Sequence, residues 1–206
     1  MDAGWFDGEI VPVPVVVDGA STSYLDHDEH PRRETTVEKL AALRVLHPEI
    51  PEATVTAGNA AGLNDGAAAL LVVSSEYARA HGLTPLARVR SWGTAALPPA
   101  RTGFAPVPAV RSALARAAVS VDDIDLWEVN EAFCAVPVAV TRELKIEQDR
   151  VNVNGSGCSL GHPIAATGAR MVVTMLGEMR RRDAALGCVS MCAGGGMGSA
   201  LVLERL

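Results

Sequence analysis

The stretch Val151-Asn-Val-Asn-Gly-Ser-Gly-Cys-Ser-Leu-Gly-His-Pro-Ile-Ala-Ala-Thr-Gly-Ala-Arg170 decides the fold. It begins with the alternation of a short strand, breaks into a loop, and returns to a helical pattern at about Ala165. The loop has special backbone geometry, because three glycines and a proline fall within nine residues: Gly155, Gly157, Gly161 and Pro163. It presents His162 close to the N-terminus of the helix, where backbone amides stabilise negative charge.

A second glycine-rich turn follows about thirty residues later, at the end of an apolar strand. The strand runs from Cys188 to Cys192, and the turn is Gly194-Gly-Gly-Met-Gly198. Backbone amides in such a turn can point at a ligand. We therefore expect the Cys192 thiol and the His162 imidazole to be delivered to loop ends of a single sheet.

The composition is that of one domain with a full-sized core. The chain has 206 residues, of which 49% are hydrophobic and only 4% aromatic, so Ala, Val, Leu and Gly must fill the interior. The formal net charge of -6 gives no reason to expect nucleic acid or acidic membranes as partners. No apolar run reaches the ~18 residues of a membrane span, and the N-terminus lacks the basic start of a signal peptide. Four cysteines without a disulfide-like pattern favour the reducing cytoplasm.

Strand and helix patterns alternate along most of the chain with short connections. We expect an extended arm over residues 1–34, followed by one domain over residues 35–206. In that domain strands are predicted at 67–73, 86–92, 124–129, 151–153, 186–192 and 199–203, and helices at 35–46, 76–81, 107–119, 131–145 and 165–181. The alternation predicts an α/β fold with a mainly parallel sheet, helices on both faces and an antiparallel pair at the end.

Two groups of side chains could be interpreted as metal sites. One is the polar cluster Asp26-His-Asp-Glu-His30, for which a solvated loop is the simpler interpretation. The other is the set Cys158, His162, Cys188 and Cys192. On a strand Cys188 and Cys192 would lie about 13 Å apart at ~3.3 Å per residue, whereas zinc ligands converge to about 2.0–2.3 Å from the metal. We therefore expect no metal.

The run Gly194-Gly-Gly-Met-Gly198 is not a dinucleotide-binding loop either. No glycines fall at the spacing that such a loop requires, and the run leads into a strand instead of a helix. Its amides stay available for another kind of ligand.

Two further features have both a structural and a chemical interpretation. Asn130 and Glu131 follow a predicted strand and could simply cap the next helix. His162 and Cys192 could exchange a proton to give a thiolate nucleophile or base. They could equally be a loop-stabilising histidine and an inert buried cysteine, and each residue taken alone leaves the choice open.

Taken together, these stretches resemble the thiolase family in letters, order and spacing. The matching motifs are Val55-Thr-Ala-Gly-Asn-Ala60, Asn64-Asp-Gly-Ala-Ala68, Asn130-Glu-Ala-Phe133, Gly161-His-Pro163, Thr167-Gly-Ala-Arg170 and Cys192-Ala-Gly-Gly-Gly-Met-Gly198. The resemblance implies a doubly wound topology and one half of a two-half architecture. The chain is similar to the C-terminal half of a thiolase, preceded by the tail of the substrate loop region. The acylated cysteine of the family belongs to the other half.

The resemblance also implies a role for each matching residue. Cys192 matches the cysteine that removes and returns a proton at the α-carbon of an acetyl group. His162 matches the histidine that activates the nucleophile and donates to a thioester oxyanion, and Asn130 matches the residue that holds a water at this oxyanion site. The amide of Gly194 matches a donor of a second oxyanion site. The implied substrate-binding residues are Ala57, Ala61, Gly62 and Phe133.

The sequence departs from the family pattern at two positions. Ala165 replaces a common glycine, which would cost about 1 kcal/mol if the position needs a positive φ. Ala61 replaces a serine that contacts the pantetheine arm of coenzyme A in many members, so one polar contact to the substrate is lost. In addition, Pro137 is expected to kink the helix near Phe133.

The expected function is therefore that of the C-terminal catalytic half of a thiolase, an acyltransferase that makes or cleaves 3-oxoacyl-CoA. Its partners would be acyl-CoA, coenzyme A, and either a thiolase N-terminal-type chain carrying the nucleophile or further copies of itself. Coenzyme A thioester is substrate, and no cofactor is expected. The alternatives are a non-catalytic thiolase-like subunit that binds or scaffolds an acyl-CoA enzyme, and a truncated product without a role of its own.

Overall fold

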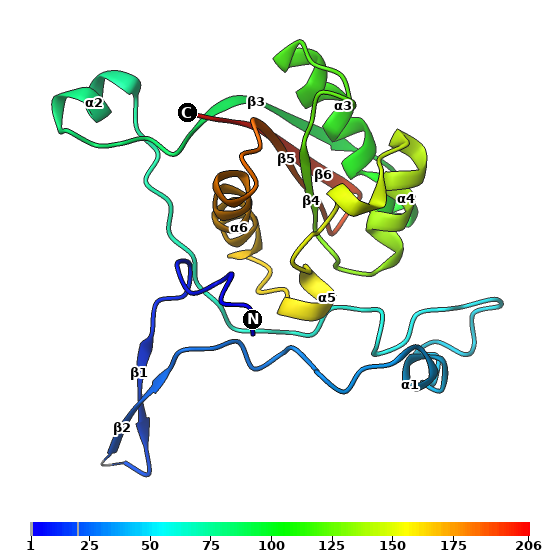
Figure 1. Ribbon diagram of the computed structural model, residues 1–206. Coiled ribbons are helices and arrows are strands. Elements are labelled where there is room, and N and C mark those ends of the chain that lie inside the picture. The colour runs from blue at the N-terminus through cyan, green and yellow to red at the C-terminus, as the bar shows by residue number, and fades with distance from the viewer. Residues whose placement is uncertain (1, 20) are drawn as a thin grey trace.

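A four-stranded sheet lies at the centre of the molecule (Figure 1). The computed structural model describes residues 2–19 and 21–206. The strand order is β3 (Ala87–Ala96), β6 (Met197–Arg205), β5 (Leu186–Ala193) and β4 (Leu126–Val129). β4 and β5 are parallel, but β6 runs antiparallel to both of its neighbours. The α/β fold and the antiparallel pair at the end of the chain, β5 with β6, are confirmed; residues 194–196 are too short a connection for any other pairing. The expectation of a mainly parallel sheet is wrong, because β6 also pairs with β3 and runs antiparallel to it.

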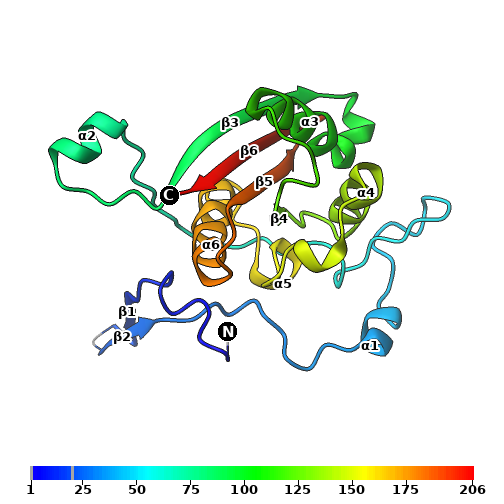
Figure 2. The same ribbon diagram turned by 45° about the horizontal axis from the view of Figure 1, so that its top comes forward.

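Helices cover the two faces of this sheet. α3 (Pro106–Ala117) and α4 (Ala135–Leu144) pack on one face, and α6 (Thr167–Arg181) packs on the other (Figure 2). Helices on both faces were predicted from the alternation of patterns, and this prediction is confirmed. β4 and most of β5 are thereby shielded from water, whereas β3 at the edge keeps several residues exposed, Trp92 at 61% among them.

Alternation along the strands divides the core into two clusters. On β5, Cys188 and Cys192 face the cluster that includes α3 and α4, whereas Val189 faces the cluster that includes α6. On β4, Trp127 belongs to the first cluster and Leu126 to the second. Each large apolar side chain buried in this way contributes about 1.5–3 kcal/mol. These clusters position the loops that leave the ends of β4 and β5.

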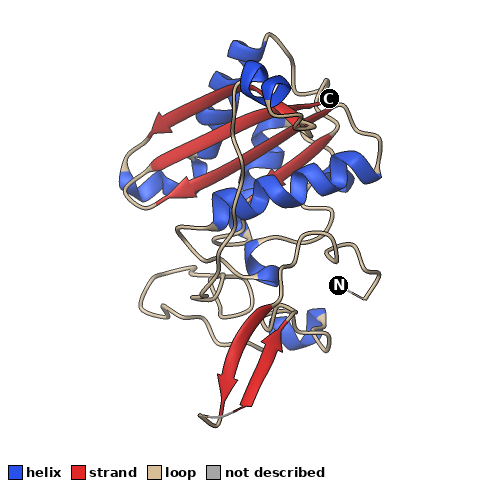
Figure 3. Ribbon diagram, turned by 90° about the vertical axis from the view of Figure 1, so that its left-hand side faces the viewer, coloured by secondary structure: helices blue, strands red, loops and turns tan. Residues whose placement is uncertain are grey.

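The first part of the chain is arranged differently. β1 (Val13–Val17) and β2 (Ser21–Leu25) pair as an antiparallel hairpin whose residues are all exposed, away from the main sheet (Figure 3). α1 (Val37–Ala41) has no buried residue, and α2 (Ser75–Ala80) buries only Ala78. The helix predicted at 35–46 is therefore a five-residue turn of helix.

The strand predicted at residues 67–73 does not form. This segment is described in full, yet it pairs with no strand in the described parts of the chain. The apolar run is of the type found in strands buried on both faces, and a strand exists only where a neighbour accepts its hydrogen bonds. Similarly, Val151 and Val153 make only isolated bridges.

Short helical turns fill several connections. η1 (Pro99–Phe104) precedes α3, η2 (Gln148–Arg150) follows α4, and α5 (Gly157–Leu160) lies in the loop before α6. α4 begins at Ala135, which places Pro137 in its first turn, where its missing N–H would have no intrahelical partner. The predicted kink is thus wrong, because Pro137 lies in the first turn of α4 and not in its interior. The division of the chain at residue 34 stays a prediction.

Candidate active site

Asn130 follows the last residue of β4 and is fully buried. Its backbone N–H donates to the carbonyl of Ser190 on β5 (2.9 Å), so it lies directly beside that strand. Its side-chain nitrogen lies 3.3 Å from Nε2 and 3.4 Å from Nδ1 of His162. The N-cap of α4 is Cys134, which excludes the helix-capping interpretation of Asn130.

His162 is held at three points. Its backbone N–H donates to Oδ1 of Asn64 (3.0 Å), and its ring Nδ1 lies 2.7 Å from Oγ1 of Thr167 at the start of α6. Because the Thr167 hydroxyl donates to the carbonyl of Pro163 (3.1 Å), it accepts the proton of His162 Nδ1. Nε2 is then the unprotonated nitrogen, and the Asn130 amide donates to it. Burial, followed by the nearby charge of Arg170, lowers the pKa of His162 and favours this neutral form.

Two glycines of the loop are required by its geometry. Gly161 has a φ of 105°, and a Cβ on Gly157 would lie only 2.8 Å from the carbonyl oxygen of Glu131. Ala165 does not have a positive φ, so the backbone cost considered for it does not arise. The loop can therefore pack tightly against residues 130–131.

Cys192 lies near the end of β5 with 6% of its surface exposed. Burial raises the pKa of its thiol and outweighs the backbone hydrogen bond that lowers it, so a thiolate-favouring environment, which the sequence suggested, is wrong for the chain by itself. Residues 2–19 and 21–206 contain no hydrogen bond between the Cys192 thiol and His162. The two residues are linked indirectly through Asn130. Its side chain contacts His162, and its backbone N–H donates to Ser190 of β5, two residues before Cys192.

The turn at Gly194 is open on its outer side. A Cβ on Gly194 would meet no heavy atom within 4 Å, whereas one on Gly196 would lie 1.9 Å from the carbonyl oxygen of Leu97. Gly196 thus fixes the turn against the protein, and Gly194 faces free space. Gly194 is also exposed.

The predicted substrate-binding residues are mostly brought together. The Ala61 N–H donates to the carbonyl of Ala132 (3.0 Å), Ala60 bridges to Phe133, and Leu63 bridges to His162. A segment of the first part of the chain therefore runs alongside the site, and Gly62 lies within it. Ala57 lies apart, on an exposed turn with none of these contacts.

Metal-site interpretations find no support in residues 2–19 and 21–206. No group of three or more His, Cys, Asp or Glu side chains there is arranged to hold a metal ion. Cys188 is fully buried in the core, away from His162 and Cys158 in the loop, and burial raises its pKa to about 12.

No described helix is long and apolar enough to span a membrane.

Comparison with known proteins agrees with the motifs and with this geometry. Residues 83–205 match the sequence model "Thiolase, C-terminal domain" and residues 1–76 match "Thiolase, N-terminal domain". The chain belongs to the thiolase family. The resemblance inferred from the motifs is thereby confirmed.

Several thiolases resemble the chain over its whole length. It is 49% identical to the acetyl-CoA acetyltransferase of Escherichia coli (strain K12), over 100% of this chain and 52% of the relative. It is 46% identical to the beta-ketoadipyl-CoA thiolase of Pseudomonas aeruginosa, over 100% of this chain and 51% of the relative. The crystal structure of the Bacillus anthracis acetyl-CoA acetyltransferase superposes with a TM-score of 0.95 at 45% identity, over 100% of this chain and 51% of that chain. The chain spans about half the length of these relatives.

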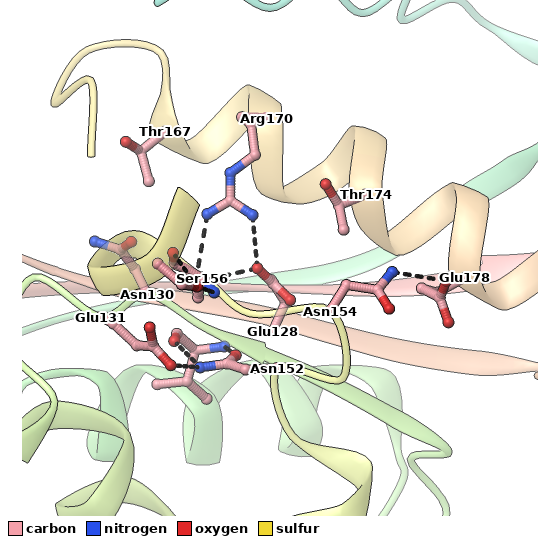
Figure 4. A network of polar contacts seen from close by, with 12 residues as sticks. Glu128, Asn130, Glu131, Asn152, Asn154, Ser156, Thr167, Arg170, Thr174 and Glu178 are labelled. Atoms are coloured by element: carbon pink, nitrogen blue, oxygen red, sulfur yellow. Dashed lines mark hydrogen bonds and ion pairs between the residues drawn. The ribbon is translucent and has the colours of Figure 1, made fainter. Parts of the chain in front are cut away.

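A buried ion pair supports the thiolase site and was not predicted. Glu128 on β4 accepts from Arg170 Nη1 of α6 (2.7 Å) and from the Ser156 hydroxyl (3.1 Å), as Figure 4 shows. Burial outweighs the Arg170 charge and raises the pKa of Glu128 to about 7. The signal in the sequence was a glutamate inside the apolar strand Leu126–Val129, because a buried charge requires a partner.

A second part of this network fixes the loop from below. Asn152 donates to Glu131 Oε1 (3.0 Å), as Figure 4 shows, and also to the Val129 carbonyl (2.8 Å). The Cys158 N–H donates to Glu131 Oε2 (3.2 Å). Glu131, which follows Asn130 in the chain, therefore holds the loop next to Asn130. Sequence reasoning considered Glu131 only as a helix-dipole partner and missed this contact.

Proposed function

We propose that this chain is the catalytic C-terminal half of a thiolase that makes or cleaves 3-oxoacyl-CoA. Acyl groups are exchanged between thioesters and coenzyme A, and a thiolase N-terminal-type chain supplies the nucleophilic cysteine. No cofactor takes part apart from the coenzyme A thioester, which is substrate. The reducing cytoplasm suits a site that depends on free thiols.

The observation that carries the proposal is the arrangement of His162 and Asn130. With its Nδ1 proton committed to Thr167, the neutral imidazole has an unprotonated Nε2 that can take the proton of a nucleophilic thiol. Once protonated, the same atom donates to a thioester oxyanion. Asn130 keeps an unpartnered buried Oδ1 within the described residues, and this oxygen can accept from a water at the oxyanion site.

Cys192 and the Gly194 amide fit the second half of the reaction. Removing a proton from the α-carbon of an acetyl thioester requires a base and a donor at the enolate oxygen, and such a donor is worth about 3 kcal/mol. Cys192 as thiolate takes the α-proton, and the resulting carbanion attacks the acyl group on the partner's cysteine. That cysteine leaves as thiolate. Cleavage is the reverse: the nucleophile attacks the 3-oxo carbon and Cys192 returns the proton.

The need for a partner chain is supported by the segment at residues 67–73. Leu71 and Val72 are 75% and 77% exposed, although the run has the composition of a doubly buried strand. A strand of the partner's sheet would satisfy its free backbone groups and cover these side chains. The N-terminal domain model covers this segment, which agrees with a partner of that type.

The proposal is tested by adding the N-terminal half of a related acetyl-CoA acetyltransferase to the chain and following thiolysis of acetoacetyl-CoA. The chain alone should be inactive, and the mixture active. His162→Ala and Asn130→Ala should each lower kcat by about 10²–10³ with a smaller change in KM. His47→Ala, at an exposed histidine, is the matched control and should be silent. If the chain cleaves acetoacetyl-CoA unaided, the two-chain proposal fails.

A second test isolates Cys192. In the active mixture, Cys192→Ala should abolish exchange of deuterium into the α-carbon of acetyl-CoA. Cys188→Ala, on the same face of the same strand, should leave the exchange in place. Unchanged exchange in Cys192→Ala, or full activity in His162→Ala, would favour a non-catalytic subunit that binds an acyl-CoA enzyme.

A further inference from the structure

Two cysteines with no role in the proposed reaction meet beside the site. Cys134 is the N-cap of α4, and Cys158 lies in α5. The Cys158 sulfur lies 3.2 Å from the carbonyl oxygen of Glu131, three residues before Cys134 in the chain, and each thiol shifts the pKa of the other. The two thiols come from segments that are 24 residues apart in the chain, since 158 − 134 = 24.

The backbones that carry these thiols are already fixed next to each other. The Cys158 N–H donates to Glu131 Oε2 (3.2 Å), and the Cys134 N–H donates to the carbonyl of Asn59 (2.8 Å). Gly157 packs so closely on Glu131 that a Cβ there would lie 2.8 Å from its carbonyl oxygen. The segments that carry the two cysteines are therefore packed against each other, and rotation of the side chains can bring the sulfurs together.

The pair differs from the other cysteines in exposure and ionisation. Cys134 and Cys158 are half-buried, whereas Cys188 and Cys192 are buried. Cys134 also lines a surface pocket with Asn59 and Phe104, which gives a reagent access to its sulfur. The neighbouring Cys158 thiol lowers the pKa of Cys134, and Cys134 in turn raises the pKa of Cys158. Cys134 is thus the better nucleophile, and Cys158 is the second thiol to react.

We propose that Cys134 and Cys158 are a reversible oxidation site, which closes to an intramolecular disulfide when a small-molecule disulfide such as glutathione disulfide is present. The packing of Cys158 against Glu131, three residues before Cys134, and the partial exposure of both thiols carry this inference. It does not depend on the proposed catalytic function.

The reaction is two successive thiol–disulfide exchanges. The Cys134 thiolate attacks one sulfur of glutathione disulfide, forms a mixed disulfide and releases one glutathione thiolate. Cys158 then loses its proton to solvent and attacks the Cys134 sulfur, which releases the second glutathione thiolate. The two protein thiols are oxidised and one glutathione disulfide is reduced to two molecules of glutathione.

The disulfide would join α5 to the start of α4. α5 lies in the loop that carries His162, and α4 follows Asn130 by a few residues. Oxidation therefore restricts the movement of this loop close to the contact between His162 and Asn130.

The test is to incubate the purified chain with glutathione disulfide under native conditions, block remaining thiols, and map disulfides by mass spectrometry without reduction. The expected product has lost two hydrogens and yields one cross-linked peptide pair that contains Cys134 and Cys158. Dithiothreitol should restore the original mass. Circular dichroism before and after oxidation checks that the chain stays folded.

Three variants separate this proposal from general oxidation. Cys158→Ser should stop at a stable glutathione adduct on Cys134, and Cys134→Ser should react at least tenfold more slowly. Cys188→Ala, the matched control, should form the disulfide as the unmodified chain does. The proposal is overturned if the native chain accumulates only glutathione adducts, or if the mapped disulfide contains Cys188 or Cys192.

Discussion

Residues 1–76 and residues 83–205, which match two different thiolase domain models, use their apolar side chains in opposite ways. All members of both core clusters lie between Val107 and Leu203. In the described part of the first region only Phe6 is a buried hydrophobic residue, while the valines of the β1 hairpin strand and Leu71 are exposed. Apolar side chains thus form a core in one region and uncovered surface in the other. Whether an apolar side chain is buried depends on whether the chain itself supplies a second layer of structure to cover it.

The largest expected effect concerns residues 67–73 of the first region, which we expect to be the surface that binds a partner chain. Leu71→Asp combined with Val72→Asp should abolish binding of a thiolase N-terminal-type chain, because charges cannot enter a buried strand. Gel filtration of the mixture measures the complex, which should bury more than ~1,000 Å². Val11→Asp with Val16→Asp, at 78% and 73% exposure, is the matched control and should still bind. Equal loss in both pairs would break the comparison.

The same substitution should have unequal effects on the stability of the isolated chain. Leu126→Ala, at 5% exposure, should lower the free energy of unfolding by about 2–5 kcal/mol. Leu71→Ala, at 75% exposure, should change it by less than about 0.5 kcal/mol. Urea unfolding followed by circular dichroism compares the two. A large loss in Leu71→Ala would show that residues 67–73 are already packed in the isolated chain.

The buried glutamate makes the stability of the second region depend on pH. The pKa of Glu128 is raised to about 7, so between its ordinary value near 4.5 and 7 the folded state binds more protons than the unfolded state. Stability should therefore fall as pH rises through this window, by at most about 3 kcal/mol at ~1.4 kcal/mol per pKa unit. Glu128→Gln should remove this slope. The check is urea unfolding of both proteins from pH 5 to 8, and an identical slope in both would contradict the assignment.

The smallest expected effect concerns the hydrogen bond by which Asn64 of the first region holds His162. Asn64→Ala removes the acceptor for the His162 N–H, which is worth about 0.5–1.5 kcal/mol. Activity of the assembled thiolase should fall by about 2–12-fold. Asn59→Ala, which removes two hydrogen bonds within a neighbouring turn, is the comparison. If Asn64→Ala is silent, the first region contributes surface but does not position the site.

The sequence was sufficient for features that a local pattern determines. The helices at α3 and α6, the strands β3 to β6, and the pairing of His162 with Asn130 in one site all follow from periodicity and motifs, within a few residues at the boundaries. The segment at 67–73 could not be predicted correctly, because its state depends on a neighbour and not on its own residues. The Glu128–Arg170 pair was missed for a related reason, since 42 residues separate its members and only the fold brings them together.

The central place of β6 has a consequence for how the protein is made. β6 is the last of the described elements in the chain, yet it lies between β3 and β5 and pairs with both. Ala87 at the start of β3 pairs with Arg205, so β3 can form its pairing only after residues more than a hundred positions later have been synthesised. Until then β3 has no partner in the sheet, and its edge stays open to other chains. The sheet of this thiolase therefore closes only after β6 has left the ribosome, and the interval before closure is when the growing chain most needs protection from aggregation.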